Sequence, residues 1–384
     1  MNARAPPGPG RAGSPANAQH PEYCCRRRAA MHSDLRSGNP MPQAHTRIIG
    51  GSDSIIFDTR ELNLSTADVL SVCRLFNLGQ LKSFEKEPNI VVSHSNFIIF
   101  VITSRGKYVI KLYPPGSKNI IGTEYLINRV LQSRHFSTPA MHLSASHQPG
   151  CRIKDYLAVC YDFAEGKPGY RVRLADQHID HLCRTLFMFK NILSGNTHIS
   201  RTLQRSGFTL QPRSIRTLIA SLTNQTDHPV LKKALLEACR YLDHNKTLLH
   251  KRPVHSNLSL SNILFDHGRT VLLDLSHTRI DHAMEDLASL IFSCRIFSAP
   301  QTVIRRIIAS YFAIHKIRQE QIRTLTALLT IRTVREYRKT ELKSPSAITH
   351  GTDPALVKEY KKQIAAHKEE LLRSLGYFAL KDAL

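Results

Sequence analysis

The pattern of apolar and polar positions differs between the first and second halves of this chain. Up to about residue 166, most apolar residues fall in short runs rich in β-branched and aromatic side chains, which is typical of strands. The turn Ser104-Arg105-Gly106 joins two of these runs and predicts an antiparallel hairpin. The expected strands are residues 81–85, 96–103, 107–113 and 156–163.

Two helices are expected among these strands. Ser65-Thr66-Ala67-Asp68 has the form of a capping box, in which a serine at the N-cap and an acid three residues later satisfy free backbone amides. Apolar residues then recur at helical spacing until Gly79 ends the helix. A second helix is expected over residues 122–134.

From residue 176 onward the apolar positions mostly follow a helical period. A polar loop and two short strands, 262–265 and 270–274, interrupt this pattern around the turn Asp266-His267-Gly268. The pattern therefore predicts an α+β fold, with a small antiparallel-sheet lobe followed by a mostly helical lobe. Helices are expected at residues 176–193, 212–223, 228–244, 283–297, 301–314, 318–340 and 354–374.

Residues 1–48 show no hydrophobic period and are rich in Pro, Gly, Ala, Ser and Arg, so we expect them to be disordered. Their many Arg and few acids are also typical of a transit peptide. A start site at Met31 or Met41 is a third interpretation of this segment. We favour disorder or a later start over targeting.

Composition narrows the class of protein. The chain has 384 residues, of which 42% are hydrophobic, which is enough for a large two-lobed domain. No apolar run approaches the ~18 residues that a membrane span needs, and none of the eight Cys forms a C-x-x-C pair. We therefore expect a soluble, cytoplasmic protein without a membrane span.

The formal charge of +23 suits anionic partners in general. A solvated basic surface is the simpler interpretation, and we expect no specific nucleic-acid partner. The same interpretation applies to the basic residues of the expected helix 318–340, in which Tyr337 is the only aromatic residue. These residues and the one that follows the helix are Arg332, Arg335, Arg338, Lys339 and Lys343.

The most informative segment runs from residue 254 to residue 287. A polar loop leads into a short strand at Asn262, and a tight turn brings back a second strand that ends at Asp274. The hairpin should place Asn262 and Asp274 side by side at one end. A carboxylate and an amide oxygen that converge in this way can hold Mg²⁺, which prefers hard oxygen ligands.

This segment resembles the catalytic loop and metal motif of the aminoglycoside phosphotransferase, homoserine kinase and choline kinase superfamily. The family pattern is H-G-D-x-x-x-x-N followed by a hydrophobic strand that ends in aspartate. His255, Asn262 and Asp274 match that pattern, whereas Ser256 stands for the glycine and Asn257 stands for the catalytic aspartate. The resemblance is closest to bacterial homoserine-kinase-like proteins.

The resemblance extends over about residues 62–345 and implies a protein-kinase-like fold. It places Lys111 where such kinases hold the phosphates of ATP, and Glu124 where the ion-pair partner of that lysine lies. It also places Asn96 in the turn that covers the phosphates, where the usual glycines are missing. The implied sheet lobe is 62–166, the helical lobe is 167–345, and 346–384 is a helical extension.

The resemblance implies an ATP- and Mg²⁺-dependent transfer of the γ-phosphate to a hydroxyl of a small molecule. The aspartate of the family accepts the proton of that hydroxyl, and Asn257 is not a base at neutral pH. A pseudokinase that binds nucleotide or a partner is therefore the alternative. We interpret His255 as a structural histidine of the metal loop, and Asp286 as a helix cap or loop anchor.

Overall fold

The computed structural model describes residues 64–86, 97–205, 229–245, 250–297, 299–316 and 321–342. The predictions for residues 1–48, for helices 212–223 and 354–374, and for the extension 346–384 concern residues outside these ranges. The lobe boundaries given above stay predictions.

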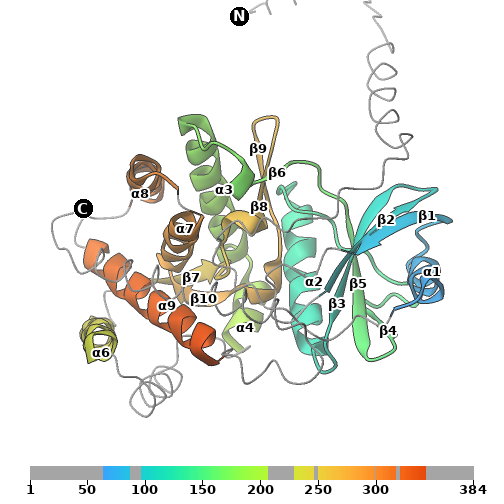
Figure 1. The fold of residues 1–384 in the computed structure, drawn as a ribbon, viewed down its shortest axis with the longest axis horizontal. Helices are drawn as coiled ribbons and strands as arrows, with labels where there is room; N and C mark the ends of the chain where they lie inside the picture. The colour runs from blue at the N-terminus through green and yellow to red at the C-terminus, as the bar shows by residue number, and fades with distance from the viewer. Residues whose placement is uncertain are drawn as a thin grey trace, which may run out of the picture. The chain divides into compact units, whose positions relative to one another are not determined.

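An antiparallel sheet of five strands forms the first lobe, in the order β1-β2-β3-β5-β4 (Figure 1). The predicted hairpin is confirmed, because the Thr103 amide donates to the Gly106 carbonyl at 2.8 Å across the turn. The short edge strand β4 was not predicted from the sequence. The strands are β1 Leu81–Lys86, β2 Phe97–Thr103, β3 Lys107–Tyr113, β4 Cys151–Ile153 and β5 Tyr156–Asp162.

Helices α1 Thr66–Leu75 and α2 Lys118–Gln132 belong to the same lobe. The predicted capping box is present at the start of α1, where Ser65 and Asp68 each accept a backbone amide of the other. Helix α2 lies between the sheet and the helices of the second lobe (Figure 1). It therefore carries residues that face both lobes.

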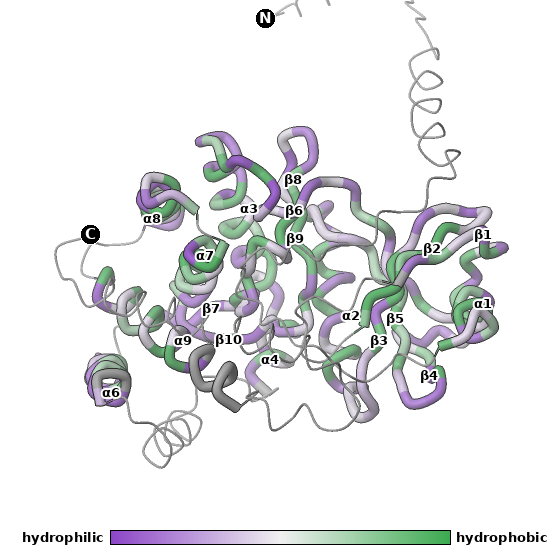
Figure 2. The backbone as a smooth tube through the Cα atoms, viewed as in Figure 1, coloured by the Kyte–Doolittle hydropathy of each residue, from purple (hydrophilic) through white to green (hydrophobic). Residues whose placement is uncertain are grey.

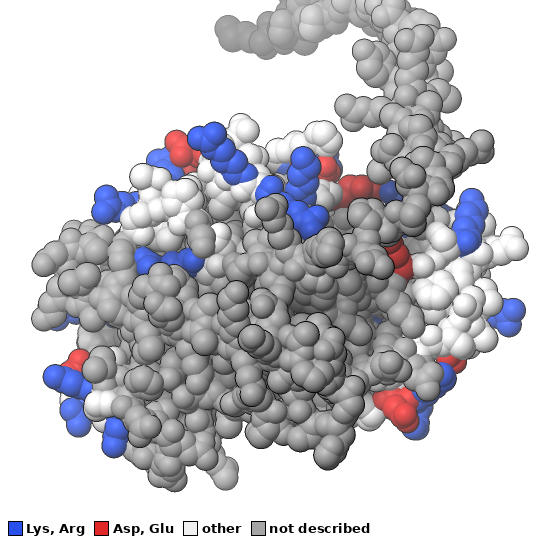
Figure 3. Space-filling view, viewed as in Figure 1, with Lys and Arg blue, Asp and Glu red and all other residues white. Residues whose placement is uncertain are grey.

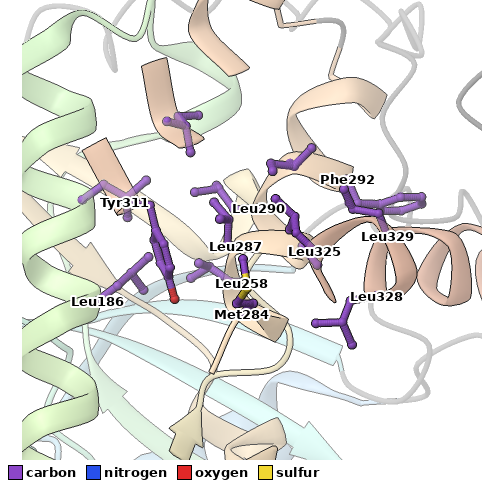
Figure 4. Close-up of a cluster of buried hydrophobic side chains, with 14 of the residues drawn as sticks. Leu186, Leu258, Met284, Leu287, Leu290, Phe292, Tyr311, Leu325, Leu328 and Leu329 are labelled. Atoms are coloured by element: carbon purple, nitrogen blue, oxygen red, sulfur yellow. The ribbon is translucent and has the colours of Figure 1, made fainter. Parts of the chain in front are cut away.

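Six helices are described in the second lobe, and their buried apolar side chains form its core. Figure 4 shows Leu186 of α3 and Tyr311 of α8 meeting Leu287 of α7 in this core. Helix α7 is hydrophobic along most of its length (Figure 2) and is buried almost throughout. The helices are α3 Asp176–Ser194, α4 Thr197–Arg205, α6 Pro229–His244, α7 Glu285–Ile296, α8 Gln301–His315 and α9 Ile322–Leu342.

Two small sheets lie in the segment that interrupts the helical pattern. Strands β8 Ile263–Asp266 and β9 Arg269–Leu272 form the predicted hairpin, with Ile263 opposite Leu272, and β6 Lys167–Pro168 pairs with β8. Strands β7 Lys251–Val254 and β10 Arg279–His282 pair with each other and were not predicted. Short 3₁₀ turns, η4 Leu260–Asn262 and η5 Leu275–His277, flank the β8–β9 hairpin.

The loop between β7 and η4 is held by charged side chains from helices far along the chain. Its residue Ser256 has a φ of 67°, in the left-handed region where the family pattern has glycine. The Ser256 amide donates to Asp286 Oδ1 at 2.9 Å, and the Ser256 carbonyl accepts from Arg332 Nη2 at 2.8 Å. Asp286, expected as a cap or an anchor, therefore anchors this loop.

A buried lysine supports the anchor. Lys190 of α3 lies with its Nζ 3.5 Å from Asp286 Oδ2 and donates to the Ala283 carbonyl at 2.5 Å. Burial lowers the pKa of Lys190, although the Asp286 carboxylate acts in the opposite direction. The loop backbone thus depends on two paired charges that are almost completely removed from water.

Two of the basic residues of α9 are not part of the solvated face that the sequence predicted. The Arg332 side chain is only 16% exposed, because it reaches Ser256 and lies 3.4 Å from Glu285 Oε1. Arg335, three residues further along α9, is partly buried, and this burial lowers the pKa of its guanidinium. On the face drawn in Figure 3, the described Lys and Arg side chains are spread over several elements.

The described helices include none that is both long enough and apolar enough to cross a membrane.

Replacing Asp286 should destabilise the protein strongly. The change Asp286→Ala leaves the Lys190 ammonium buried without its carboxylate, and we expect a loss of roughly 3–5 kcal/mol in the free energy of unfolding. Chemical denaturation measures this loss. Asp176→Ala, which removes an exposed acid from α3, is the matched control and should change the free energy by less than about 0.5 kcal/mol.

The double variant Lys190→Met/Asp286→Asn tests how much of the stability loss comes from the interaction between these two charges. If the two charges support each other, the double variant should lose less stability than the sum of the two single variants. A loss below about 1 kcal/mol for Asp286→Ala would contradict the anchoring role.

Candidate active site

Two charged residues that are 163 positions apart in the sequence meet between the sheet lobe and the β8–β9 hairpin. Lys111 Nζ of β3 lies 2.5 Å from Asp274 Oδ1, just beyond the end of β9. The side chains are 8% and 19% exposed. Burial opposes the charged form of Lys111, but the carboxylates of Asp274 and Glu124 outweigh it and raise the pKa of the amine.

The Asp274 carboxylate is held by more than the lysine. Its Oδ1 also accepts from Ser276 Oγ at 2.6 Å. Burial works against the charged form here as well, but Lys111 and the nearby His277 outweigh it and lower the pKa of Asp274 below its usual range. Asp274 itself has a φ of 56°, which turns the chain sharply at this point.

Glu124, the expected ion-pair partner of Lys111, makes a different contact. Both residues are described and buried, yet no ion pair joins them within 4.0 Å, and the Glu124 carboxylate instead accepts from the Tyr113 hydroxyl. Burial raises the pKa of Glu124, although Lys111 lowers it. The predicted pair is thus replaced in this structure by the pair of Lys111 with Asp274.

The backbone of Asn262 is bonded to that of Leu273, the residue before Asp274, at the end of the hairpin where the sequence predicts both site residues. The Leu273 amide donates to the Asn262 carbonyl at 2.9 Å. Asn262 is the last residue of the 3₁₀ turn η4 and directly precedes strand β8. Its Nδ2 donates a hydrogen bond to the Asn257 carbonyl at 2.9 Å. The side-chain amide oxygen of Asn262 therefore remains free to coordinate a cation.

His255 occupies a structural position. It is completely buried, and its Nε2 donates to the Leu273 carbonyl at 2.7 Å, directly before Asp274. Its Nδ1 has no hydrogen-bond partner in the described part of the chain. This geometry supports the interpretation of His255 as a residue that holds the backbone at Asp274.

Asn257 stands at the start of the same loop with a partly buried side chain. Its backbone carbonyl accepts from Asn262 and from the Ser259 amide, the latter at 3.0 Å. Its carboxamide makes no hydrogen bond to any described residue, so it is available to a bound molecule. Asn96, the remaining predicted residue, lies outside the described ranges.

The donor set fits a hard cation. The free atoms of Asp274 and Asn262 are oxygens, which is the ligand chemistry that Mg²⁺ prefers. The described residues contain no group of three or more His, Cys, Asp and Glu that could hold a metal by themselves. A metal here would therefore need oxygens from a bound phosphate or from water.

Two residues of this site were missed from the sequence. Ser276 follows Asp274 by two positions, and Tyr113 follows Lys111 by two positions on the same strand. Side chains two apart on a strand lie on one face, so this spacing was the available signal for Tyr113. For Ser276 the sequence offered no signal beyond closeness to Asp274.

The chain matches a known protein family over most of its described length. The model of APH, the phosphotransferase enzyme family, matches residues 91–319. No curated protein with which the chain was compared matches it significantly. The narrower resemblance to homoserine-kinase-like proteins stays a prediction.

Solved structures share the fold at low sequence identity. An amicoumacin kinase in complex with AMP-PNP, Ca²⁺ and Ami aligns with a TM-score of 0.60 and 14% identity, covering 80% of this chain and 93% of that one. The spectinomycin phosphotransferase APH(9)-Ia in complex with ADP and spectinomycin aligns with a TM-score of 0.56 and 13% identity, covering 81% and 99%. The GDP and kanamycin complex of APH(2")-IIia aligns with a TM-score of 0.55 and 16% identity, covering 82% and 99%.

These neighbours confirm the predicted fold class, a two-lobed kinase-like α+β fold. Because the family model matches more than half of the sequence, the chain belongs to the APH phosphotransferase enzyme family.

Proposed function

We propose that this protein binds Mg·ATP and transfers the γ-phosphate to a hydroxyl group of a small molecule. The observation that carries the proposal is the meeting of Lys111 with Asp274, beside the loop that bears Asn257 and Asn262. A lysine from the sheet lobe and acceptor oxygens from the helical lobe are the groups that phosphoryl transfer requires for the phosphates and the metal.

Solved neighbours support a nucleotide as the donor, since they were crystallised with ADP, AMP-PNP and GDP. In this chain Lys111 would bind phosphate oxygens, and Asp274 with the amide oxygen of Asn262 would hold the metal. When bound, the metal neutralises charge on the transferring phosphoryl group. His255 would keep the Asp274 backbone in place through its bond to Leu273.

The acceptor would meet Asn257. Its free carboxamide can accept a hydrogen bond from a hydroxyl and so orient the oxygen toward the phosphate, but it does not take the proton. The kinase-like fold relies mainly on positioning and charge stabilisation, so transfer without a base is slow rather than impossible. The proton would leave to solvent or to a phosphate oxygen.

A second candidate function is that of a pseudokinase, which binds nucleotide or a partner and signals through its conformation without transferring phosphate. Asn257 favours it, because the residue expected to act as base is an amide. The pair of Lys111 with Asp274 also favours it, because the ammonium lies on the carboxylate that would bind the metal. The two functions differ in turnover and share the nucleotide site.

The change Asp274→Asn should weaken Mg·ATP binding by at least about tenfold, because a charged contact to the metal is lost. Isothermal titration calorimetry measures this affinity. Asp266→Asn, in the turn of the same hairpin, is the matched control and should leave the affinity unchanged. Equal affinities for wild type and Asp274→Asn would show that Asp274 holds no metal-nucleotide complex.

The change Asn257→Asp should raise phosphoryl transfer, since a general base typically contributes about 10²–10⁴-fold. ATP turnover with and without a panel of hydroxylated small molecules measures the effect. Kanamycin and spectinomycin belong in the panel because solved neighbours bind them. The double variant Asn257→Asp/Asp274→Asn should be inactive.

Turnover by the wild type that is lost in Asp274→Asn would support the enzyme and exclude the pseudokinase. Binding without turnover in the wild type, with turnover restored in Asn257→Asp, would establish the pseudokinase. If Asn257→Asp leaves turnover unchanged, Asn257 does not occupy the position that meets the acceptor hydroxyl.

A further inference from the structure

Tyr113 contacts both members of the expected lysine–glutamate pair. Its ring centroid lies 4.8 Å from Lys111 Nζ, and its hydroxyl donates a hydrogen bond to the Glu124 carboxylate. Lys111 and Tyr113 are two positions apart on β3, so their side chains lie on the same face of the sheet. Tyr113 is 2% exposed and Glu124 is 1% exposed, so water does not compete for this contact.

This contact gives the Glu124 carboxylate a partner other than Lys111. A buried carboxylate needs hydrogen-bond donors, and the Tyr113 hydroxyl supplies one at short range. Glu124 therefore remains in place on α2 without the ammonium. At the same time, the ring of Tyr113 covers one side of Lys111 Nζ. The face of the aromatic ring attracts this ammonium group.

Lys111 is left with Asp274 as its ion-pair partner among the described residues. The oxygen that it contacts, Oδ1, also accepts from Ser276, so this atom already has two donors. A divalent cation at Asp274 would meet the ammonium at close range and would be repelled by it. Lys111 and the metal therefore compete for the same carboxylate.

We propose that Tyr113 is a positioning residue that keeps Glu124 from binding Lys111, so that Lys111 occupies Asp274 and restricts metal binding there. The inference rests on the proposed function, since it assigns Asp274 to the metal of the nucleotide complex. Metal-nucleotide binding then requires Lys111 to move from Asp274 to the phosphates and Glu124. The Tyr113 hydroxyl sets how readily that move occurs.

A second hydroxyl acts on the same carboxylate. The hydroxyl of Tyr161, on the neighbouring strand β5, is buried and, like that of Tyr113, helps to lower the pKa of Glu124. Tyr161→Phe would therefore also disturb Glu124, so the control for Tyr113 is the double variant Tyr113→Phe/Glu124→Gln. Tyr113→Phe keeps the ring over Lys111 and removes only the contact to Glu124.

Crystal structures of the nucleotide-free protein test the placement directly. We expect Lys111 Nζ on Asp274 in the wild type, and on Glu124 in Tyr113→Phe. In Tyr113→Phe/Glu124→Gln the attracting charge is gone, so Lys111 should return to Asp274. A Tyr113→Phe structure with Lys111 still on Asp274 would overturn the proposal.

The metal requirement gives a second readout that a merely structural role would not change. We expect Tyr113→Phe to lower the Mg²⁺ concentration needed for half-maximal ADP binding by roughly tenfold, the effect of one hydrogen bond to a charged group. Affinity for ADP without metal should be the same in the wild type and in Tyr113→Phe. An unchanged Mg²⁺ requirement in Tyr113→Phe would contradict the role of Tyr113.

The two tests also separate this inference from the proposed function. If no form of the protein binds ADP with Mg²⁺, the proposed function fails, and the crystal structures still decide whether Tyr113 controls the partner of Lys111. If ADP binds and Lys111 does not move in Tyr113→Phe, the proposed function stands and the positioning role of Tyr113 fails.

Discussion

The contact between Lys111 and Asp274 is the constraint on which the arrangement of this protein depends. Both groups are largely removed from water, and a buried charge without a partner costs several kcal/mol. The strand β3 and the end of the β8–β9 hairpin must therefore come together, although they lie in different lobes and far apart in the sequence. Helix α2, which lies between the sheet and the second lobe (Figure 1), carries Glu124 to the same place.

A second set of buried charges holds the neighbouring loop and takes no part in the chemistry that we propose. Asp286 of α7 and Arg332 of α9 hydrogen-bond the backbone of Ser256, and Lys190 of α3 pairs with Asp286. The contacts to the loop end on backbone groups, so the carboxamide of Asn257 and the amide oxygen of Asn262 are left free to meet a ligand. This division explains how a loop with a serine at positive φ, in place of the glycine of the family pattern, keeps a defined shape.

Much of the fold could be predicted because its signals are local. The capping box at Ser65, the hairpin turn at Gly106 and the turn between β8 and β9 each involve a few neighbouring residues, and all are present. The second of these hairpins brings the backbone of Asn262 to Leu273, directly before Asp274. The contacts of Tyr113 and Arg332 could not be predicted, because they depend on how distant elements pack. Basic residues at helical spacing look solvated in a sequence, and only the packing of α9 shows that Arg332 reaches the loop.

In the function that we propose, Asp274 and Asn262 hold the metal of a nucleotide complex whose phosphates Lys111 binds. A crystal structure of the wild-type protein with Mg²⁺ and AMP-PNP tests it most directly. We expect a metal ion in contact with oxygens of Asp274 and Asn262, with Lys111 Nζ moved from Asp274 to a phosphate oxygen. A nucleotide bound elsewhere, or Lys111 still paired with Asp274 beside a bound nucleotide, would contradict it.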